Sequence, residues 1–372
     1  MKPGRAGAAP RVVYFGFPVR SHAVPSLALI RKLVERGAAV DYYSTAAWTA
    51  PVESAGARFV AYEASCEIAS NPQPAMSVGA YVNVIAALAS ELDTGLADAA
   101  RGADVIIFDA SACWGRAAAN AAGAPAVAFA TTFAFTRPML QMMGVRDPEH
   151  LAMLVPAADL KIICTSREFQ PAGHALEESY IFAGPLIEER PRAGEVVTKV
   201  SSRPLAYVSL GTLFNRNQDL LLKIAESLSA AGYEVVVALG RNNSACTAVW
   251  PPNVRAIPFV DQMSVLRLAD LAVTHAGMAS MSEIMACGVP AIAIPQAVDQ
   301  FLVAKRAASL GAAVIVDSGS GIDAALGQIR ENATRMRDAA RSIAHSFSNA
   351  TPIDEIADRV LAFATHSAGV AG

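Results

Sequence analysis

The feature that most constrains the fold is a regular alternation of short β-rich apolar runs with longer helical segments. In the first half of the chain the pattern predicts strands at 12–15, 40–43, 104–108, 126–129 and 160–163. It also predicts a helix that begins at Pro25, a residue suited to the first helical position, and runs to about Arg36. Strands separated by helices favour right-handed βαβ crossovers and a mainly parallel sheet.

The second half repeats the pattern, with strands predicted at 205–209, 233–239, 271–274, 291–294 and 313–316 and a helix at 220–231. A length of 372 residues fits two α/β domains, each with a doubly wound sheet. The segment 184–204 holds three prolines and several charges without periodicity. We therefore expect an N-terminal domain at 1–183, a linker at 184–204 and a C-terminal domain at 205–351. A last helix in 352–372 is expected to dock on either domain, with the N-terminal one as a candidate.

Composition narrows the class of protein. A hydrophobic fraction of 53% against 17% charged residues supplies apolar side chains for a core in both halves. Lysine and arginine number 30 against 33 acidic residues, without a basic block, which disfavours nucleic acid as a partner. Five scattered cysteines without a CxxC pair argue against a disulfide framework or a structural zinc site. Neither a signal peptide nor a membrane-spanning apolar run is evident, so a cytoplasmic protein without integral membrane association is expected.

One group of candidate functional residues follows the strands of the first half. His22 lies between the first strand and its helix, in a segment that lacks the GxGxxG fingerprint of dinucleotide-binding proteins. A neutral imidazole there can accept a proton near pH 7, and Asp109, at the end of strand 104–108, could orient it. The alternative is a loop histidine and an aspartate that cap local structure. Only the distance between the two side chains decides between these interpretations.

The second group lies in 270–283, where a predicted strand enters a glycine-containing turn and then a helix. The free N–H groups and positive dipole end of such a helix bind phosphate. A structural interpretation is also available, because Ser280 and Glu283 have capping-box spacing and Gly288 suits a helix end. Capping alone does not account for His275 before the turn or for Asp299 and Gln300 after the next strand. The chain has no P-loop, HExxH, GxSxG or DxD motif.

Four segments in order resemble one family. Residues 21–27 resemble its GHxxPxL segment, 182–185 its FVGP junction, 209–215 its SLGTxFN loop, and 254–300 its nucleotide-sugar signature block. Over nearly its whole length the chain is similar to the GT-B glycosyltransferases of the UDP-glycosyltransferase superfamily, and most to the bacterial macrolide-glycosyltransferase branch. The resemblance implies two Rossmann-like doubly wound domains facing across a cleft, the N-terminal one for the acceptor and the C-terminal one for the nucleotide sugar.

The resemblance also implies roles for individual residues. His22 would be the general base and Asp109 its partner. Gln262 would lie by the nucleobase and Glu283 by the ribose hydroxyls, while Asp299 and Gln300 would bind the sugar. The whole donor-binding set is Thr212, Gln262, His275, Gly277, Met278, Ser280, Glu283, Asp299 and Gln300, with His275, Ser280 and the helix start at Gly277 on the diphosphate. The sequence departs from the family at Ala279, which replaces a frequent Asn, and at Met278, where plant members have Trp.

The implied reaction is an inverting, metal-independent transfer of a hexose to a hydroxyl of a hydrophobic small molecule. A UDP-sugar is the favoured donor and a TDP-sugar the alternative, and no cofactor is expected beside this co-substrate. The acceptor would be a polyketide, macrolide or polyphenol natural product, and the enzyme a monomer or homodimer. The acceptor loops are rich in apolar and aromatic side chains, which suit such a molecule: Met76, Tyr81, Phe133, Phe135, Met139 and Met142. Ordinary core packing explains these side chains equally well.

Other functions stay open. A catalytically silent nucleotide-sugar-binding partner protein would need the same donor site, although keeping both His22 and Asp109 speaks against it. A sugar-nucleotide epimerase of the same fold should carry further catalytic acids, and a peripheral-membrane lipid glycosyltransferase an apolar patch with basic neighbours; neither is evident. A dehydrogenase is disfavoured because the glycine fingerprint is missing.

Overall fold

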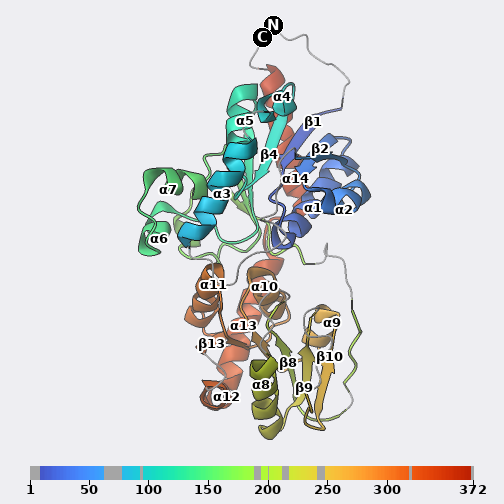
Figure 1. Ribbon diagram of the computed structural model, residues 1–372, viewed down its shortest axis with the longest axis vertical. Helices are drawn as coiled ribbons and strands as arrows, with labels where there is room; N and C mark the ends of the chain where they lie inside the picture. The colour runs from blue at the N-terminus through green and yellow to red at the C-terminus, as the bar shows by residue number, and fades with distance from the viewer. Residues whose placement is uncertain are drawn as a thin grey trace. The chain divides into compact units, whose positions relative to one another are not determined.

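The protein, described here from a computed structural model, forms two compact α/β units (Figure 1). The structure describes residues 9–62, 78–92, 95–187, 194–199, 201–211, 218–240, 248–317 and 321–369. Of these, the first unit holds the residues up to 187 together with 349–369, and the second holds 194–348. The chain thus enters the second unit between 187 and 194 and returns to the first at Asn349.

The first unit is built on a seven-stranded parallel sheet with the order β3-β2-β1-β4-β5-β6-β7. Its strands are β1 (Arg11–Phe15), β2 (Ala39–Ser44), β3 (Arg58–Ala61), β4 (Val105–Asp109), β5 (Ala126–Ala130), β6 (Leu160–Ile163) and β7 (Tyr180–Phe182). The strand order reverses between β1 and β4, which are hydrogen-bonded neighbours, with Phe15 opposite Phe108. Such a reversal is the point where open α/β sheets leave room for a ligand at the strands' carboxyl ends.

Both faces of this sheet are buried, as the continuous apolar strands require. Val12 and Tyr14 of β1 point to one core, whereas Val13 and Phe15 point to the other. The helices that contribute to the first core are α1 (Arg20–Glu35), α2 (Thr49–Ser54) and α14 (Ile353–Gly369). Those that contribute to the second are α3 (Val78–Leu92), α4 (Leu96–Ala100), α5 (Trp114–Ala122), α6 (Arg137–Met142) and α7 (Pro148–Leu154). Figure 1 shows α1 and α14 together on one side, and α3 and α5 on the other.

The second unit repeats this topology with a six-stranded parallel sheet, in the order β10-β9-β8-β11-β12-β13. The strands are β8 (Leu205–Ser209), β9 (Glu234–Ala238), β10 (Val254–Ile257), β11 (Leu271–Thr274), β12 (Ala291–Ala293) and β13 (Ala313–Ile315). Its helices are α8 (Gln218–Ala230), α9 (Gln262–Leu266), α10 (Met278–Ala286), α11 (Val298–Ser309), α12 (Ile322–Glu331) and α13 (Ala333–Ser348). Here the strand order reverses between β8 and β11, so the predicted pair of doubly wound sheets is confirmed.

The first helix begins earlier than predicted. Helix α1 starts at Arg20 rather than at Pro25, so Pro25 lies inside the helix and cannot donate to the carbonyl of Ser21. The N–H groups of His22 and Ala23 both bond to the Val19 carbonyl and close the first turn nonetheless. The start of the helix is thus set by contacts of this first turn, and His22 becomes a helical residue.

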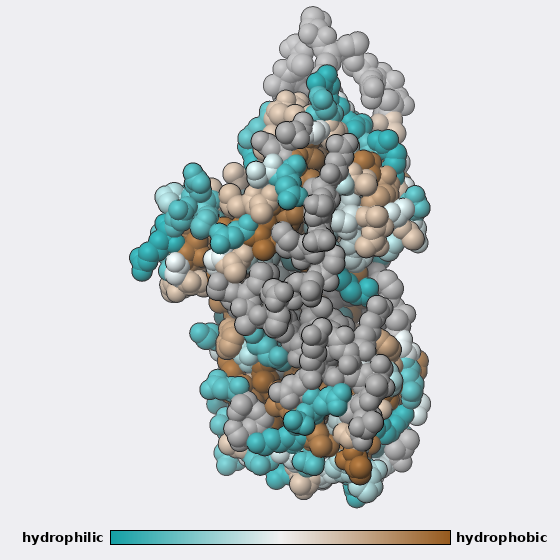
Figure 2. All heavy atoms as spheres, viewed as in Figure 1, coloured by the Kyte–Doolittle hydropathy of each residue, from teal (hydrophilic) through white to brown (hydrophobic). Residues whose placement is uncertain are grey.

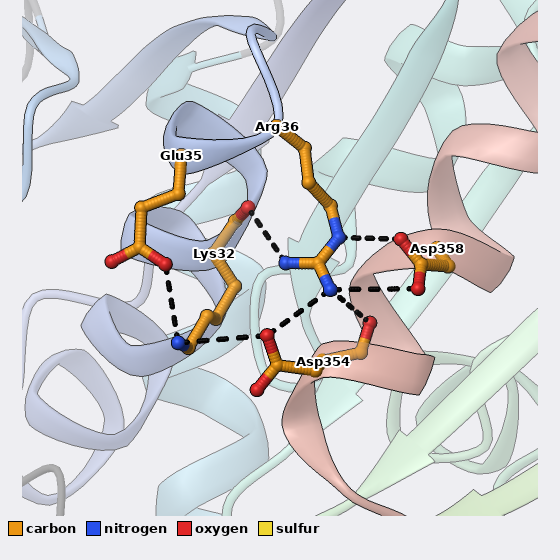
Figure 3. Close-up of polar contacts among 5 residues, drawn as sticks. All are labelled: Lys32, Glu35, Arg36, Asp354 and Asp358. Carbon is orange, nitrogen blue, oxygen red and sulfur yellow. Dashed lines mark hydrogen bonds and ion pairs between the residues drawn. The ribbon is translucent and has the colours of Figure 1, made fainter.

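The last helix closes the first unit by packing against α1. Ile356, Ala357 and Val360 of α14 are fully buried in the core shared with α1. Figure 3 shows the polar rim of this contact, in which Arg36 bonds to the carboxylates of Asp354, at 3.1 Å, and Asp358. Lys32 joins the rim through Asp354 at 3.5 Å. Because exposed ion pairs contribute little, the apolar side chains supply most of the stability of this contact.

The surface drawn in Figure 2 carries hydrophilic side chains interspersed with smaller apolar areas on both units. Within the described residues, none of the helices is both long enough and apolar enough to cross a membrane.

We predict that Ile356→Ala destabilises the first unit by about 2–5 kcal/mol, because it removes a fully buried side chain and leaves a cavity. Urea unfolding should be followed in a Trp250→Phe background, where the fluorescence comes from Trp48 and Trp114 of the first unit. Asp358→Asn serves as the control and should give a smaller shift that fades with added salt. Equal shifts for the two variants would contradict the apolar origin of the contact.

Candidate active site

In the first unit, His22 and Asp109 meet at the reversal of the strand order. His22 follows β1 in the first turn of α1, and Asp109 is the last residue of the neighbouring strand β4. The His22 Nδ1 atom lies 3.0 Å from both carboxylate oxygens of Asp109. The histidine side chain is 15% exposed and the carboxylate 1%. The pair that the sequence left undecided is therefore formed, 87 residues apart along the chain.

This geometry fixes which ring nitrogen can act on a substrate. A carboxylate only accepts hydrogen bonds, so Nδ1 of His22 carries the hydrogen toward Asp109. In the neutral ring the lone pair is then on Nε2, the atom that can remove a proton. The ring of Phe17 lies against the imidazole, with centroids 5.1 Å apart, and restricts its rotation.

A second layer of hydrogen bonds holds the buried carboxylate in place. The backbone N–H of Ser111 donates to Asp109 Oδ1 at 2.8 Å. The hydroxyl of Tyr81, from α3, donates to Ser111 Oγ at 2.7 Å. Because a buried carboxylate is costly without partners, these bonds and His22 together make an ionised Asp109 tolerable.

A cavity of about 30 Å³ opens beside this pair within the first unit. Besides His22 and Asp109, its lining includes Tyr81, Phe133 and Phe135, three of the expected acceptor residues. Met139 and Met142 do not belong to this lining: Met139 is buried in α6, and Met142 is 83% exposed. Met76 lies outside the described residues.

The lining also contains Lys161, which no sequence pattern marks as a candidate. Its ammonium donates to Ser179 Oγ at 3.2 Å and lies 4.7 Å from the centre of the Tyr180 ring. Lys161 lies within the strand β6, and a lysine in a strand is usually an ordinary surface residue, so the sequence gives no sign of its place in the cavity.

In the second unit, the turn from β11 to α10 lies at the other reversal. His275 and Ala276 follow the strand, Gly277 is the N-cap, and the helix begins at Met278. Ser280 is thus the third helical residue, so the capping-box interpretation, which needs Ser280 as N-cap, is wrong. The first N–H groups of α10 lack intrahelical partners and carry the positive end of the helix dipole.

Two glycines enclose the imidazole of His275. A Cβ atom on Gly277 would lie 2.5 Å from His275 Nε2, and one on Gly211 2.8 Å from the same nitrogen. Gly211, which follows β8, also has a left-handed φ of +81°. Both positions therefore require glycine for the main chain to approach the ring this closely.

The histidine itself is held neutral. Burial lowers the pKa of His275 to about 4, although a hydrogen bond with the main chain of Ser209 acts to raise it. Its Nδ1 atom is fully buried and has no hydrogen-bond partner among the described residues. At neutral pH this ring can donate or accept a hydrogen bond without contributing a positive charge.

The remaining donor-site candidates have distinct environments. Gln262, at the start of α9, bonds through Nε2 to Glu283 Oε2 at 2.5 Å. Gln300 is 5% exposed, and its Oε1 accepts from the N–H groups of Gln296 and Ala297, so only its amide nitrogen is left to bind a ligand. Asp299 is exposed at the start of α11, and Met278 is buried. Thr212 lies outside the described residues.

Within the described residues, no cluster of three or more His, Cys, Asp or Glu is arranged to hold a metal ion.

Comparison with known proteins agrees with this arrangement. A family model described as "Erythromycin biosynthesis protein CIII-like, C-terminal domain" matches residues 222–363. The NDP-glycosyltransferase YjiC of Bacillus licheniformis is 29% identical over 344 residues, which cover 81% of this chain and 83% of that protein. The oleandomycin glycosyltransferase of Streptomyces antibioticus is 26% identical over 346 residues, 81% of this chain and 78% of that one.

Solved structures give the same fold. The glycotransferase of kitacinnamycin superposes with a TM-score of 0.82 at 24% identity, covering 95% of this chain and 99% of its own. The calicheamicin glycosyltransferase CalG4 gives 0.81 at 22% identity, with 95% and 98% covered.

The two parallel sheets, with polar residues gathered at both reversals, therefore define a GT-B fold. The matches to the CIII-like domain and to named glycosyltransferases show that the chain is a glycosyltransferase, similar to the macrolide-type members of the UDP-glycosyltransferase superfamily. The family resemblance seen in the sequence motifs is confirmed.

We predict that Gly277→Ala destabilises the second unit by about 1–3 kcal/mol, because its methyl group would meet the His275 ring. The backbone at Gly277, with φ −59° and ψ 143°, suits alanine, so the clash is the main cost. In a His275→Ala background the same substitution should cost much less. Unfolding free energies from urea titration test this, and an equal cost in both backgrounds would contradict it.

We also predict that His275 makes stability depend on pH. Between pH 6.5 and about 4 the unfolded chain binds a proton that the folded imidazole refuses, so stability falls as the pH falls through this window. Relative to His275→Asn, the wild type should lose about 2 kcal/mol between pH 7 and pH 5. Urea unfolding in a Trp48→Phe, Trp114→Phe background, where the fluorescence comes from Trp250 of the second unit, measures this difference. Parallel pH profiles for the two proteins would show that His275 is not buried in its neutral form.

Proposed function

We propose that the protein is an inverting, metal-independent glycosyltransferase that moves a hexose from a nucleotide sugar to a hydroxyl of a hydrophobic small molecule. The observation that carries the proposal is the His22–Asp109 pair, a buried carboxylate that orients an imidazole beside a cavity. A protein that only bound nucleotide sugars would have no use for this base.

In the proposed reaction, Nε2 of His22 takes the proton from the acceptor hydroxyl as its oxygen attacks the anomeric carbon. The bond between that carbon and the diphosphate oxygen breaks, and its electron pair leaves with the nucleoside diphosphate. Attack from the side opposite the leaving group inverts the configuration of the anomeric carbon. Asp109 stabilises the imidazolium that forms, as an oriented carboxylate does in other base-catalysed reactions.

The second unit would bind the donor through the turn 275–280. The diphosphate gains negative charge as it leaves, and the free N–H groups at the start of α10 supply donors already oriented toward it. His275 adds a hydrogen bond without a charge, because its pKa of about 4 keeps the ring neutral at pH 7. This set of donors supports a reaction that needs no metal ion to neutralise the diphosphate.

The substrates are proposed by class. A UDP-sugar is the favoured donor and a TDP-sugar the alternative; the related structure of VinC, 20% identical, was solved in complex with dTDP. For the acceptor, the aromatic and alanine-rich lining of the cavity supports a hydrophobic natural product, as does the likeness to an oleandomycin glycosyltransferase.

We predict that His22→Ala lowers the transfer rate by about 10²–10⁴, the usual contribution of a positioned base, while affinity for the nucleotide stays unchanged. The assay is mass spectrometry of products from UDP- and dTDP-glucose with a panel of macrolide and polyphenol acceptors. His174→Ala, which changes an exposed histidine of the same unit, is the matched control and should keep full activity. An active His22→Ala enzyme would exclude His22 as the base, and nucleotide binding without any product would favour the silent binding protein.

A further inference from the structure

Three side chains of the second unit form a chain of hydrogen bonds whose first member has no role in the proposed reaction. The hydroxyl of Tyr207, in β8, donates to Oε1 of Gln262 in α9 at 3.1 Å. The amide nitrogen of Gln262 donates to Oε2 of Glu283 in α10 at 2.5 Å. The chain therefore connects one strand and two helices.

Chemistry fixes the direction of this chain. A carboxylate can only accept, so the amide of Gln262 must turn its nitrogen to Glu283 and its oxygen to Tyr207. The tyrosine hydroxyl, as donor, stabilises that orientation and opposes the reversed one, in which Oε1 would face a negative charge. Tyr207 is 2% exposed, and burial raises the pKa of its hydroxyl well above the ordinary value, so it keeps its proton.

The position of the chain ties it to the ligand edge of the sheet. Tyr207 lies on β8 opposite Ala272 of β11, at the reversal of the strand order. Four residues beyond it, Gly211 packs against His275. Glu283 lies in α10, the helix whose start would bind the diphosphate. A carboxylate beside the phosphate site of a doubly wound sheet is suited to accept hydrogen bonds from ribose hydroxyls.

We propose that Tyr207 is a positioning residue for the nucleotide donor, which acts by holding the Gln262 amide so that the Glu283 carboxylate is preset for the ribose hydroxyls. This inference rests on the proposed function, because it requires a nucleotide in the second unit. It makes Tyr207 sensitive to the sugar of the nucleotide rather than to the diphosphate.

The test compares two nucleotides that differ only in those hydroxyls. Isothermal calorimetry would measure the affinity of the full-length wild type and of Tyr207→Phe for UDP and for 2′,3′-dideoxyuridine diphosphate. Loss of one buried hydrogen bond should weaken UDP binding about fivefold to tenfold in the variant. Binding of the dideoxy nucleotide should be equal in the two proteins, because it offers nothing to Glu283.

Two further variants separate positioning from general damage. Tyr42→Phe removes a buried tyrosine hydroxyl, bonded to Ser26 at 2.9 Å, from the first unit and should leave UDP affinity unchanged. In a Glu283→Gln background, Tyr207→Phe should cause no further loss, since the preset carboxylate is already gone.

The outcomes separate this inference from the function on which it rests. Wild-type UDP affinity in Tyr207→Phe, or an equal loss for both nucleotides, would overturn the positioning role while leaving a nucleotide-binding protein. A wild type that binds neither UDP nor dTDP would overturn the proposed function itself. If dTDP alone is bound, dTDP and its 3′-deoxy analogue replace the uridine pair, with the same expected contrast.

Discussion

Where a parallel sheet reverses its strand order, the connections on the two sides leave in opposite directions and the carboxyl ends of two strands stay accessible. Both units of this protein use that space. In the first, His22 follows β1 and Asp109 ends β4. In the second, Gly211 follows β8 and His275 follows β11. The same topological constraint therefore assembles both candidate sites from residues far apart in sequence.

The two sites favour opposite charge states of their buried polar side chains. Asp109 is a buried acid surrounded by hydrogen-bond donors, from His22 and from the main chain of Ser111, which suit its charged form. His275 is a base packed among glycine main-chain atoms, and burial lowers its pKa, which suits the neutral form. In the proposed reaction the oriented imidazole of His22 would remove a proton, and the neutral ring of His275 would add a hydrogen bond to the diphosphate.

The last helix shows that units of structure and units of sequence do not coincide. The family model matches 222–363, a range that ends inside α14. Yet α14 packs on α1 and belongs to the first unit. Helix α1 carries His22 in its first turn, so the end of the chain helps to support the candidate base.

Periodicity and apolar runs in the sequence determined the two parallel sheets, because strands buried on both faces must be apolar throughout. The same patterns did not reveal β3, β7 and β10. These three strands lie at sheet edges and carry polar or partly exposed residues such as Arg58 and Arg255. Motifs placed His22 and His275 among the candidates, and the end of a predicted strand placed Asp109 there, but only the tertiary structure decided that His22 and Asp109 touch. It also decided that α1 starts at Arg20, that Gln300 bonds to its own turn, and that Tyr207 holds Gln262. Contacts between distant residues depend on how the strands pair in space, which local pattern does not encode.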